Sequence, residues 1–146
     1  MSAPEPDYVD AKGRPRWREN DRLAERLKEL HDLLVIGGYP PDHAARYPKL
    51  AYAISRHPEP IGRMKDDGRL REIPGIGPTV QGIVTELIET GDCAKTREPS
   101  DGYVPPPRTV LEMTAIPGLG ARLARALWQE KGIASAAALR DAEAAG

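Results

Sequence analysis

Two short segments hold the residues of this chain best suited to bind an anion: residues 73–77 (Ile-Pro-Gly-Ile-Gly) and residues 116–120 (Ile-Pro-Gly-Leu-Gly). The second begins 43 residues after the first, and each stands between two stretches of helical periodicity. Two glycines on either side of one aliphatic residue, between two helices, are typical of a helix-hairpin-helix unit. Glycine permits backbone geometry that a side chain would block, and it lets a large partner approach closely. The helix after each turn presents unpaired amides at the positive end of its dipole, so each hairpin is predicted to bind an anion.

A polymeric anion that engages both hairpins is nucleic acid, held by its sugar-phosphate backbone without readout of bases. The residues predicted to contact DNA are Gly75, Gly77, Thr79, Gly118, Gly120, Ala121, Arg122 and Arg125. The alternative is that both segments are ordinary glycine-terminated helices. The matching context of the two copies counts against that alternative.

The two hairpins are not expected to be equivalent. Pro78 suits the first turn of the helix after the first hairpin, but it removes one amide that a phosphate could use. That helix, residues 79–90, holds no Lys or Arg, whereas Arg122 and Arg125 lie one turn apart beside the second hairpin. We therefore predict that the second hairpin is the stronger phosphate contact and that the first is mainly structural.

Helices must stand on both sides of each hairpin, and apolar periodicity predicts them. The expected helices cover residues 21–35, 42–56 with a firm part from Pro48 onward, 79–90, 121–130 and 134–144, with a short helix or turn at 60–67. Asn20 is the expected N-cap of the first helix, and Leu123 and Leu127 are expected in the core.

The predicted fold class is all-α, with two small helical lobes that each contain a helix-hairpin-helix unit and are joined by a Pro-rich linker. We expect a disordered tail over residues 1–19, a first helical domain with the first hairpin over 20–91, the linker over 92–108, and the second lobe over 109–146.

Composition limits the kinds of partner. The 146 residues carry a net charge of −1, with 14 Lys or Arg against 15 Asp or Glu in residues 1–90 and 7 against 7 in residues 91–146. Dedicated nucleic-acid-binding proteins are usually basic, so DNA binding must depend here on local geometry and should be weak and salt-sensitive. Aromatic residues make up 5% and Phe is absent, so the core must be aliphatic.

The remaining reactive residue types predict little chemistry. The lone Cys93 excludes an internal disulfide and fits a reducing compartment. No stretch approaches the roughly 18 apolar residues of a membrane span, and the N-terminus is polar, so we expect neither a span nor a signal peptide. The expected location is the cytoplasm, with association to the nucleoid if the source is bacterial. His31, His43 and His57 share no metal-ligand spacing, and none forms a triad pattern with Cys93.

A longer series of features follows one order along the chain. It comprises residues 20–24 (Asn-Asp-Arg-Leu-Ala) through Gly37, residues 47–54, Pro58, Ile61, the first hairpin, residues 89–91 (Glu-Thr-Gly), and the second hairpin through residues 132–135 (Gly-Ile-Ala-Ser). This order resembles the N-terminal part of family X DNA polymerases: the small amino-terminal domain of DNA polymerase beta and its bacterial relatives, followed by a second hairpin subdomain. The resemblance runs from Asn20 to the C-terminus.

The resemblance implies that hairpin carbonyls hold a monovalent cation, Na⁺ or K⁺, that bridges to a DNA phosphate. The matching carbonyls are those of Arg71, Ile73, Ile76, Thr114, Ile116 and Leu119. No other cofactor is expected. The family's first domain also removes a 5′-deoxyribose phosphate through a lysine Schiff base. Ile83 occupies that lysine's position and Thr79 that of a supporting lysine, and isoleucine cannot form an imine.

We therefore expect no catalytic residue, no efficient lyase, and no polymerase, whose palm aspartates lie beyond the region that the resemblance covers. The favoured function is a sequence-nonspecific DNA-binding module at gaps, nicks or ends in DNA repair. Two alternatives stay open: a lyase with a relocated lysine, such as Lys49 or Lys65, and a protein-interaction adaptor that has lost DNA binding. The expected partner is gapped, nicked or single-stranded DNA, with a DNA-repair protein as a second candidate. We expect a monomer and no membrane. Whether the chain is free-standing or part of a longer protein stays open.

Overall fold

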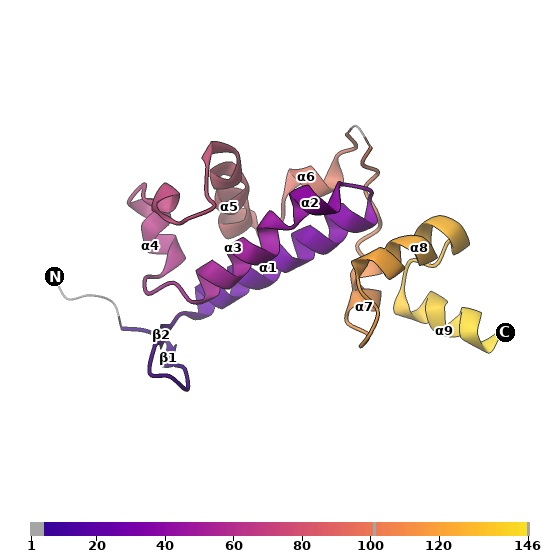
Figure 1. Cartoon of the computed structure of the whole chain (residues 1–146), viewed down its shortest axis with the longest axis horizontal. Helices are drawn as coiled ribbons and strands as arrows, with labels where there is room; N and C mark the ends of the chain where they lie inside the picture. Colours follow the sequence, from indigo (N-terminus) through magenta and orange to yellow (C-terminus); the bar gives the residue numbers. More distant parts are fainter. Residues whose placement is uncertain (1–4, 101, 146) are drawn as a thin grey trace. The chain divides into compact units, whose positions relative to one another are not determined.

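The computed structural model describes residues 5–100 and 102–145, and over these the chain is predominantly helical, which confirms the all-α class (Figure 1). The elements in order are β1 (Tyr8–Val9), β2 (Pro15–Arg16), α1 (Arg18–Ile36), α2 (Pro41–Ala44), α3 (Arg46–Ser55), α4 (Ile61–Asp66), the 3₁₀ helix η1 (Leu70–Glu72), α5 (Pro78–Thr90), α6 (Ala94–Arg97), α7 (Val110–Thr114), α8 (Ala121–Lys131) and α9 (Ala136–Ala144). Within the described residues, no helix is long and apolar enough to cross a membrane.

The chain divides into two compact units. The first, the N unit, comprises residues up to Lys28 together with Arg46–Cys93, and it holds the first hairpin. The second, the C unit, comprises Glu29–Ala45 together with residues from Ala94 onward, and it holds the second hairpin. The division falls inside α1, whereas the expected boundaries place all of residues 20–91 in one domain. A helix of this length has room for two sets of packing partners, and its own periodicity does not show where one set ends.

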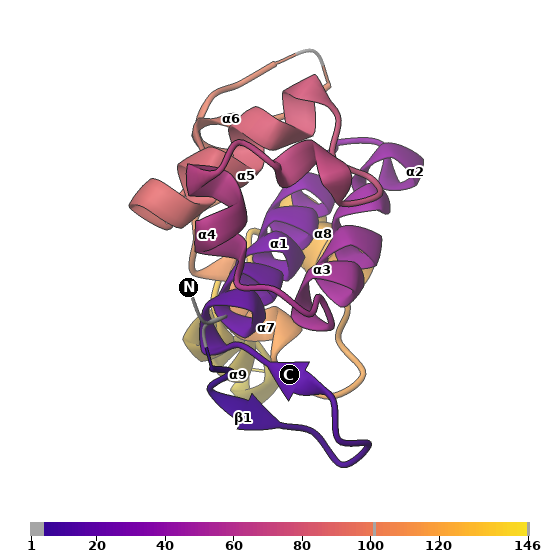
Figure 2. The ribbon, with the colours of Figure 1, turned by 90° about the vertical axis from the view of Figure 1, so that its left-hand side faces the viewer.

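In the N unit, residues 5–19 are structured, so the expected disordered tail is wrong there, while residues 1–4 lie outside the described part. β1 and β2 pair antiparallel beside the start of α1 (Figure 2). Trp17 is 6% exposed, and its indole nitrogen donates to the carbonyl of Pro58 at 3.2 Å. The Asp10 carboxylate accepts the backbone N–H of Arg14 at 3.0 Å, which closes the turn between the strands. The sequence showed no sign of this structure because a buried indole and local hydrogen bonds stabilise it, and neither produces an apolar period.

The expected role of Asn20 as N-cap of α1 is also wrong, because the helix begins earlier and encloses it. Asn20 is fully buried, and its amide donates to the carbonyl of Glu59 at 2.9 Å. Its side-chain oxygen accepts the backbone N–H of Ile61 at 2.8 Å, while Glu19 accepts that of Gly62 at 2.7 Å. Two side chains of α1 thus satisfy the first amides of α4, which leads through η1 into the first hairpin.

The core of the N unit is mainly aliphatic, as composition predicts, but Tyr47 and Trp17 are buried in it as well. Its main buried side chains are Leu23, Leu27, Tyr47, Leu50, Ile54, Ile61, Met64, Leu70, Ile73, Val80, Ile83, Val84 and Leu87. The helix predicted over residues 79–90 is confirmed as α5, whose buried stripe includes Ile83 at 8% exposure. Pro48 lies in the first turn of α3, where a proline nitrogen needs no hydrogen-bond partner.

The core of the C unit joins the second half of α1 to α7, α8 and α9. Its buried members are Leu33, Ile36, Val110, Met113, Leu119, Ala124 and Ile133. The expected burial of Leu123 is wrong, since its side chain is 48% exposed and Ala124 takes the inward position, while Leu127 packs against the core from its edge. Neighbouring helical positions point about 100° apart, so a shift of one residue in the assigned face exchanges a core position for a surface one.

Residues 92–108 do more than connect. They include α6, and Tyr103 is 2% exposed with its hydroxyl donating to the carbonyl of Thr96 at 2.9 Å. The Tyr103 ring lies so close to Gly37 that a Cβ there would stand 2.3 Å from a ring carbon. The amide of Val104 donates to the carbonyl of Gly37 at 2.9 Å. Residues 94–108 therefore belong to the C unit, because the side chain missing at Gly37 leaves room for the tyrosine.

Candidate nucleic-acid interface

The two hairpins adopt the same backbone turn. In the first, the amide of Ile76 bonds the carbonyl three residues earlier at 3.1 Å, and Gly75 has a φ of +97°. In the second, the amide of Leu119 bonds the carbonyl three residues earlier at 3.0 Å, and Gly118 has a φ of +83°. Proline at the second position and a glycine of positive φ at the third describe a type II turn. The repeat in the sequence is thus a repeat in geometry.

The aliphatic residue between the glycines holds each turn to its own core. Ile76 is 5% exposed and Leu119 is 8% exposed. The glycines beside them lie at the surface of their units, Gly75 and Gly118 exposed among them. The backbone predicted to meet phosphate is therefore accessible in both hairpins.

The second glycine of each hairpin is not required by the fold. Gly77 and Gly120 are the N-caps of α5 and α8, with φ of −97° and −85°, values that any residue adopts. A Cβ at either position would meet no atom within 4 Å. Glycine is an acceptable N-cap, and here the absent side chain leaves the first-turn amides open to a ligand.

The number of open amides differs between the hairpins as the sequence predicts. At α8 the first bonded amide is that of Ala124, which donates to Gly120 at 3.0 Å, so the three amides of residues 121–123 have no partner among the described residues. At α5 the first bonded amide is that of Gln81, and Pro78 has no N–H, so only residues 79 and 80 offer one. The second hairpin therefore presents more open backbone amides than the first.

The first hairpin has an arginine that the sequence argument missed. Arg71 comes from η1, and its Nε donates to the side-chain oxygen of Gln81 at 2.8 Å across the hairpin. Counting charges only in the helix after the turn could not find it, because the two residues meet only when the hairpin closes. The two hairpins therefore differ less in their nearby arginines than expected. The Arg71 side chain is, however, already hydrogen-bonded to Gln81.

The two arginines expected beside the second hairpin have different surroundings. Arg122 is exposed and has no hydrogen bond or ion pair within the described part of the chain. Arg125 is half-buried, and its guanidinium donates to the carbonyl of Ile36, the last residue of α1, at 2.8 Å. A cation at a helix C-terminus satisfies an open carbonyl and complements the dipole. Arg122 is therefore the side chain best placed to meet a phosphate, and Arg125 mainly holds the C unit together.

A cleft of about 460 Å³ opens beside the second hairpin within the C unit. Its lining residues are His31, Val35, Pro41, Asp42, Ala45, Gly120, Ala121 and Arg122. Asp42 also lines this cleft, so its carboxylate disfavours an anion near it, while the open amides and Arg122 favour one at the start of α8.

The carbonyls that the family resemblance assigns to a cation follow the same turn. Those of Ile73 and Ile116 already accept the turn hydrogen bond. The others belong to Arg71, Ile76, Thr114 and Leu119, and among the described residues they accept no backbone hydrogen bond. A carbonyl has two lone pairs, so all six retain the capacity to ligate a cation.

The lysines available for imine chemistry lie apart from the expected position. Ile83 is part of the buried stripe, and Thr79 is exposed. Lys65 Nζ lies 3.5 Å from carboxylate oxygens of both Asp66 and Glu89. The Lys65 ammonium is thus held in ion pairs with two carboxylates.

An ion pair in the N unit orders the approach to the first hairpin. The guanidinium of Arg69 donates to both carboxylate oxygens of Glu59, at 3.0 and 3.2 Å. This hydrogen bonding lowers the pKa of Glu59, against a smaller opposing effect of desolvation, and raises the pKa of Arg69. The pair ties the segment before α4 to the residue before η1 and so helps to position the turn.

Comparison with models of known protein families and with curated proteins finds no match to this chain.

Proposed function

We propose that the chain is a sequence-nonspecific DNA-binding module that contacts the sugar-phosphate backbone at gaps, nicks or ends in DNA repair, and that it is not an enzyme. The start of α8 carries this proposal: three open amides, an N-cap glycine with free space in front of it, and the unpartnered Arg122. The open amides at the start of α8 and the exposed Arg122 beside them can donate hydrogen bonds to the oxygens of a phosphodiester. Such contacts do not distinguish bases, so the binding is sequence-nonspecific.

The first hairpin plays the smaller part in this proposal. It offers fewer amides, and its nearby Arg71 is engaged by Gln81. The carbonyls of both turns would hold Na⁺ or K⁺ against the phosphate, as in the family that the sequence resembles. Relationship to the N-terminal region of family X DNA polymerases is part of the proposal, and it rests on the order of the elements and on the shared turn geometry.

The test is titration of a gapped duplex and of the same duplex without a gap, followed by fluorescence anisotropy. Arg122→Glu should weaken binding about tenfold or more, the scale of one charge-assisted hydrogen bond. The matched control is Arg140→Glu, the same change at an exposed position of α9. Substitutions of residues 79–81 should each cost less than Arg122→Glu. Equal losses at the two hairpins would refute the predicted asymmetry.

Salt dependence gives a second measurement. If each hairpin neutralises about two phosphates, the log–log slope of affinity against salt on duplex DNA should be roughly −3 to −4. Arg122→Glu should flatten that slope by about one. An unchanged slope would mean that this arginine does not contact phosphate.

The two alternative functions predict different outcomes. A lyase with a relocated lysine would give a covalent adduct when borohydride is added with a 5′-abasic phosphate substrate. An adaptor would bind no gapped duplex even at roughly 20 to 50 mM salt, where phosphate contacts are strongest. Its support is the net charge of −1, which is unusual for a DNA-binding module.

A further inference from the structure

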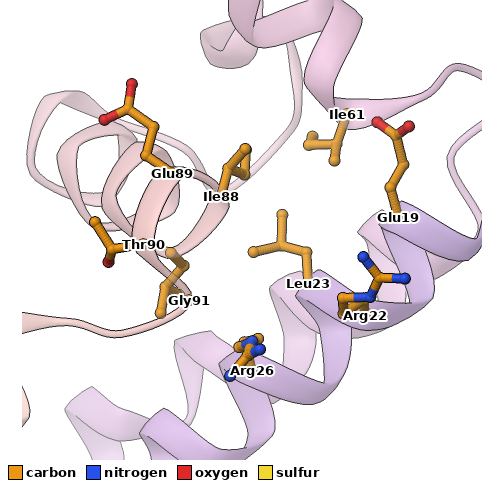
Figure 3. A pocket seen from close by; sticks show the side chains of 10 residues that line it. Glu19, Arg22, Leu23, Arg26, Ile61, Ile88, Glu89, Thr90 and Gly91 are labelled. Carbon is orange, nitrogen blue, oxygen red and sulfur yellow. The ribbon is translucent and has the colours of Figure 1, made fainter.

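A second surface, in the N unit, holds two arginines that the proposed DNA contact does not use. Arg22 and Arg26 lie one turn apart on α1 and line a pocket of about 300 Å³, with the last turn of α5 on the other side (Figure 3). Neither has a hydrogen bond or ion pair within residues 5–100 and 102–145. The guanidinium of Arg26 packs against Gly91, where a Cβ would stand 3.2 Å from its central carbon. Both guanidinium groups therefore keep their donors for a ligand.

The carboxylates in the pocket wall do not neutralise these arginines, because each is engaged elsewhere. Glu19 accepts the backbone N–H of Gly62 at 2.7 Å. Glu89 lies 3.5 Å from the ammonium of Lys65. One added carboxylate between the two arginines would therefore find donors that match its geometry.

The floor of the pocket is apolar. Leu23, Ile61 and Ile88 point toward one another across it, with the arginines on the α1 side (Figure 3). Leu23 and Ile61 are buried and Ile88 is half-buried, so an aliphatic group beside the charge of a ligand would pack against Ile88.

The last turn of α5 favours a peptide over a nucleic acid as the ligand of this pocket. Ile88 and Glu89 expose helix-terminal carbonyls that accept no hydrogen bond from the described residues. This is the negative end of the α5 dipole, so it disfavours a run of phosphates. A peptide has N–H donors for such carbonyls, whereas the DNA backbone has none.

We propose that this pocket binds an extended segment of a partner protein in which an aspartate or glutamate stands next to an aliphatic side chain. The carboxylate lies between Arg22 and Arg26, the aliphatic group covers the floor, and backbone N–H groups meet the end of α5. The inference does not depend on the proposed DNA contact, whose main part lies at the second hairpin in the C unit.

The test uses a fluorescein-labelled nonapeptide of alternating glutamate and leucine, with a glutamine-leucine peptide of the same length as the comparison probe. The acidic probe should bind the full chain saturably, and Arg22→Glu should weaken it about tenfold or more. Arg22 is exposed and unpartnered, so this variant should unfold at the wild-type temperature. The glutamine probe should bind the wild type about as weakly as the acidic probe binds the variant.

Lys28→Glu is the matched control, because it makes the same charge change on α1 outside the pocket. It should leave binding of the acidic probe unchanged. In an amide ¹⁵N spectrum, saturation with the probe should shift Ile88 and Gly91 and leave Gly120 in place. The proposal is overturned by no saturable binding, by equal loss in Lys28→Glu and Arg22→Glu, or by displacement of the probe from the pocket by a 5′-phosphorylated oligonucleotide.

Discussion

Replacing Gly120 by serine tests whether this glycine is required for the stability of the fold or for the binding of a ligand. Gly120 has a φ of −85° and free space in front of it, so serine fits without strain. Serine is a better N-cap than glycine by a few tenths of a kcal/mol, and it restricts the unfolded chain by about 0.4–1 kcal/mol. The free energy of unfolding should therefore rise by about 0.5–1 kcal/mol, measured by urea denaturation.

The same change should weaken DNA binding. A serine N-cap accepts the amide of the third helical residue, as Ser135 does in α9, where it accepts the amide of Ala138 at 3.1 Å. At α8 the serine would occupy the amide of Leu123 and put a side chain in the path of the phosphate. Loss of one charge-assisted hydrogen bond costs about 1.5–3 kcal/mol, so affinity for a gapped duplex should fall about tenfold or more.

Two further substitutions sharpen this test by fluorescence anisotropy and urea denaturation. Gly77→Ser makes the same change at the first hairpin and should reduce affinity less. Gly118→Ala should destabilise the fold by about 1–2 kcal/mol, because its φ of +83° suits only glycine. A Gly120→Ser protein that is more stable and binds DNA with wild-type affinity would refute the view that phosphate approaches this hairpin.

Two other predictions concern stability. Arg125→Ala removes the hydrogen bond to the last carbonyl of α1 and should lower the free energy of unfolding by about 1–3 kcal/mol in urea denaturation, whereas an unchanged value would assign that contact no energetic role. Glu59→Gln should destabilise the protein at neutral pH, because the pKa of Glu59 is lowered by Arg69. A lowered pKa contributes stability above the ordinary value of 4.5 that is lost as the pH falls through the lower folded value, so thermal melts of the two proteins should converge as the pH falls from 4.5 through that value. A difference that persists at low pH would contradict this account.

The helices and turns could be predicted from the sequence because local rules govern them. The helix α5 appears where it is expected, and so do the paired turns, because periodicity and a Pro-Gly step act over a few residues. The difference in open amides follows from Pro78 alone. For the same reason the hairpins were the site that the sequence could indicate.

Contacts between distant residues could not be predicted in this way. Arg125 was expected at DNA but bonds a carbonyl 89 residues away, and Arg71 reaches Gln81 only through the closed hairpin. Asn20 looks like a helix cap in the sequence, yet it caps a different helix. Each side chain has the chemistry that the sequence assigns to it, while the partner depends on how the chain packs.

The amino-acid sequence by itself determined where the main helices form, that two glycine turns repeat, and that the second offers more backbone donors, since these properties need only neighbouring residues. Only the tertiary structure showed that α1 belongs to two units and that Tyr103 packs against Gly37. It also showed that Arg122 is the arginine beside the second hairpin without a partner among the described residues. Those outcomes depend on which surfaces exclude water together, and many different packings satisfy the same local pattern.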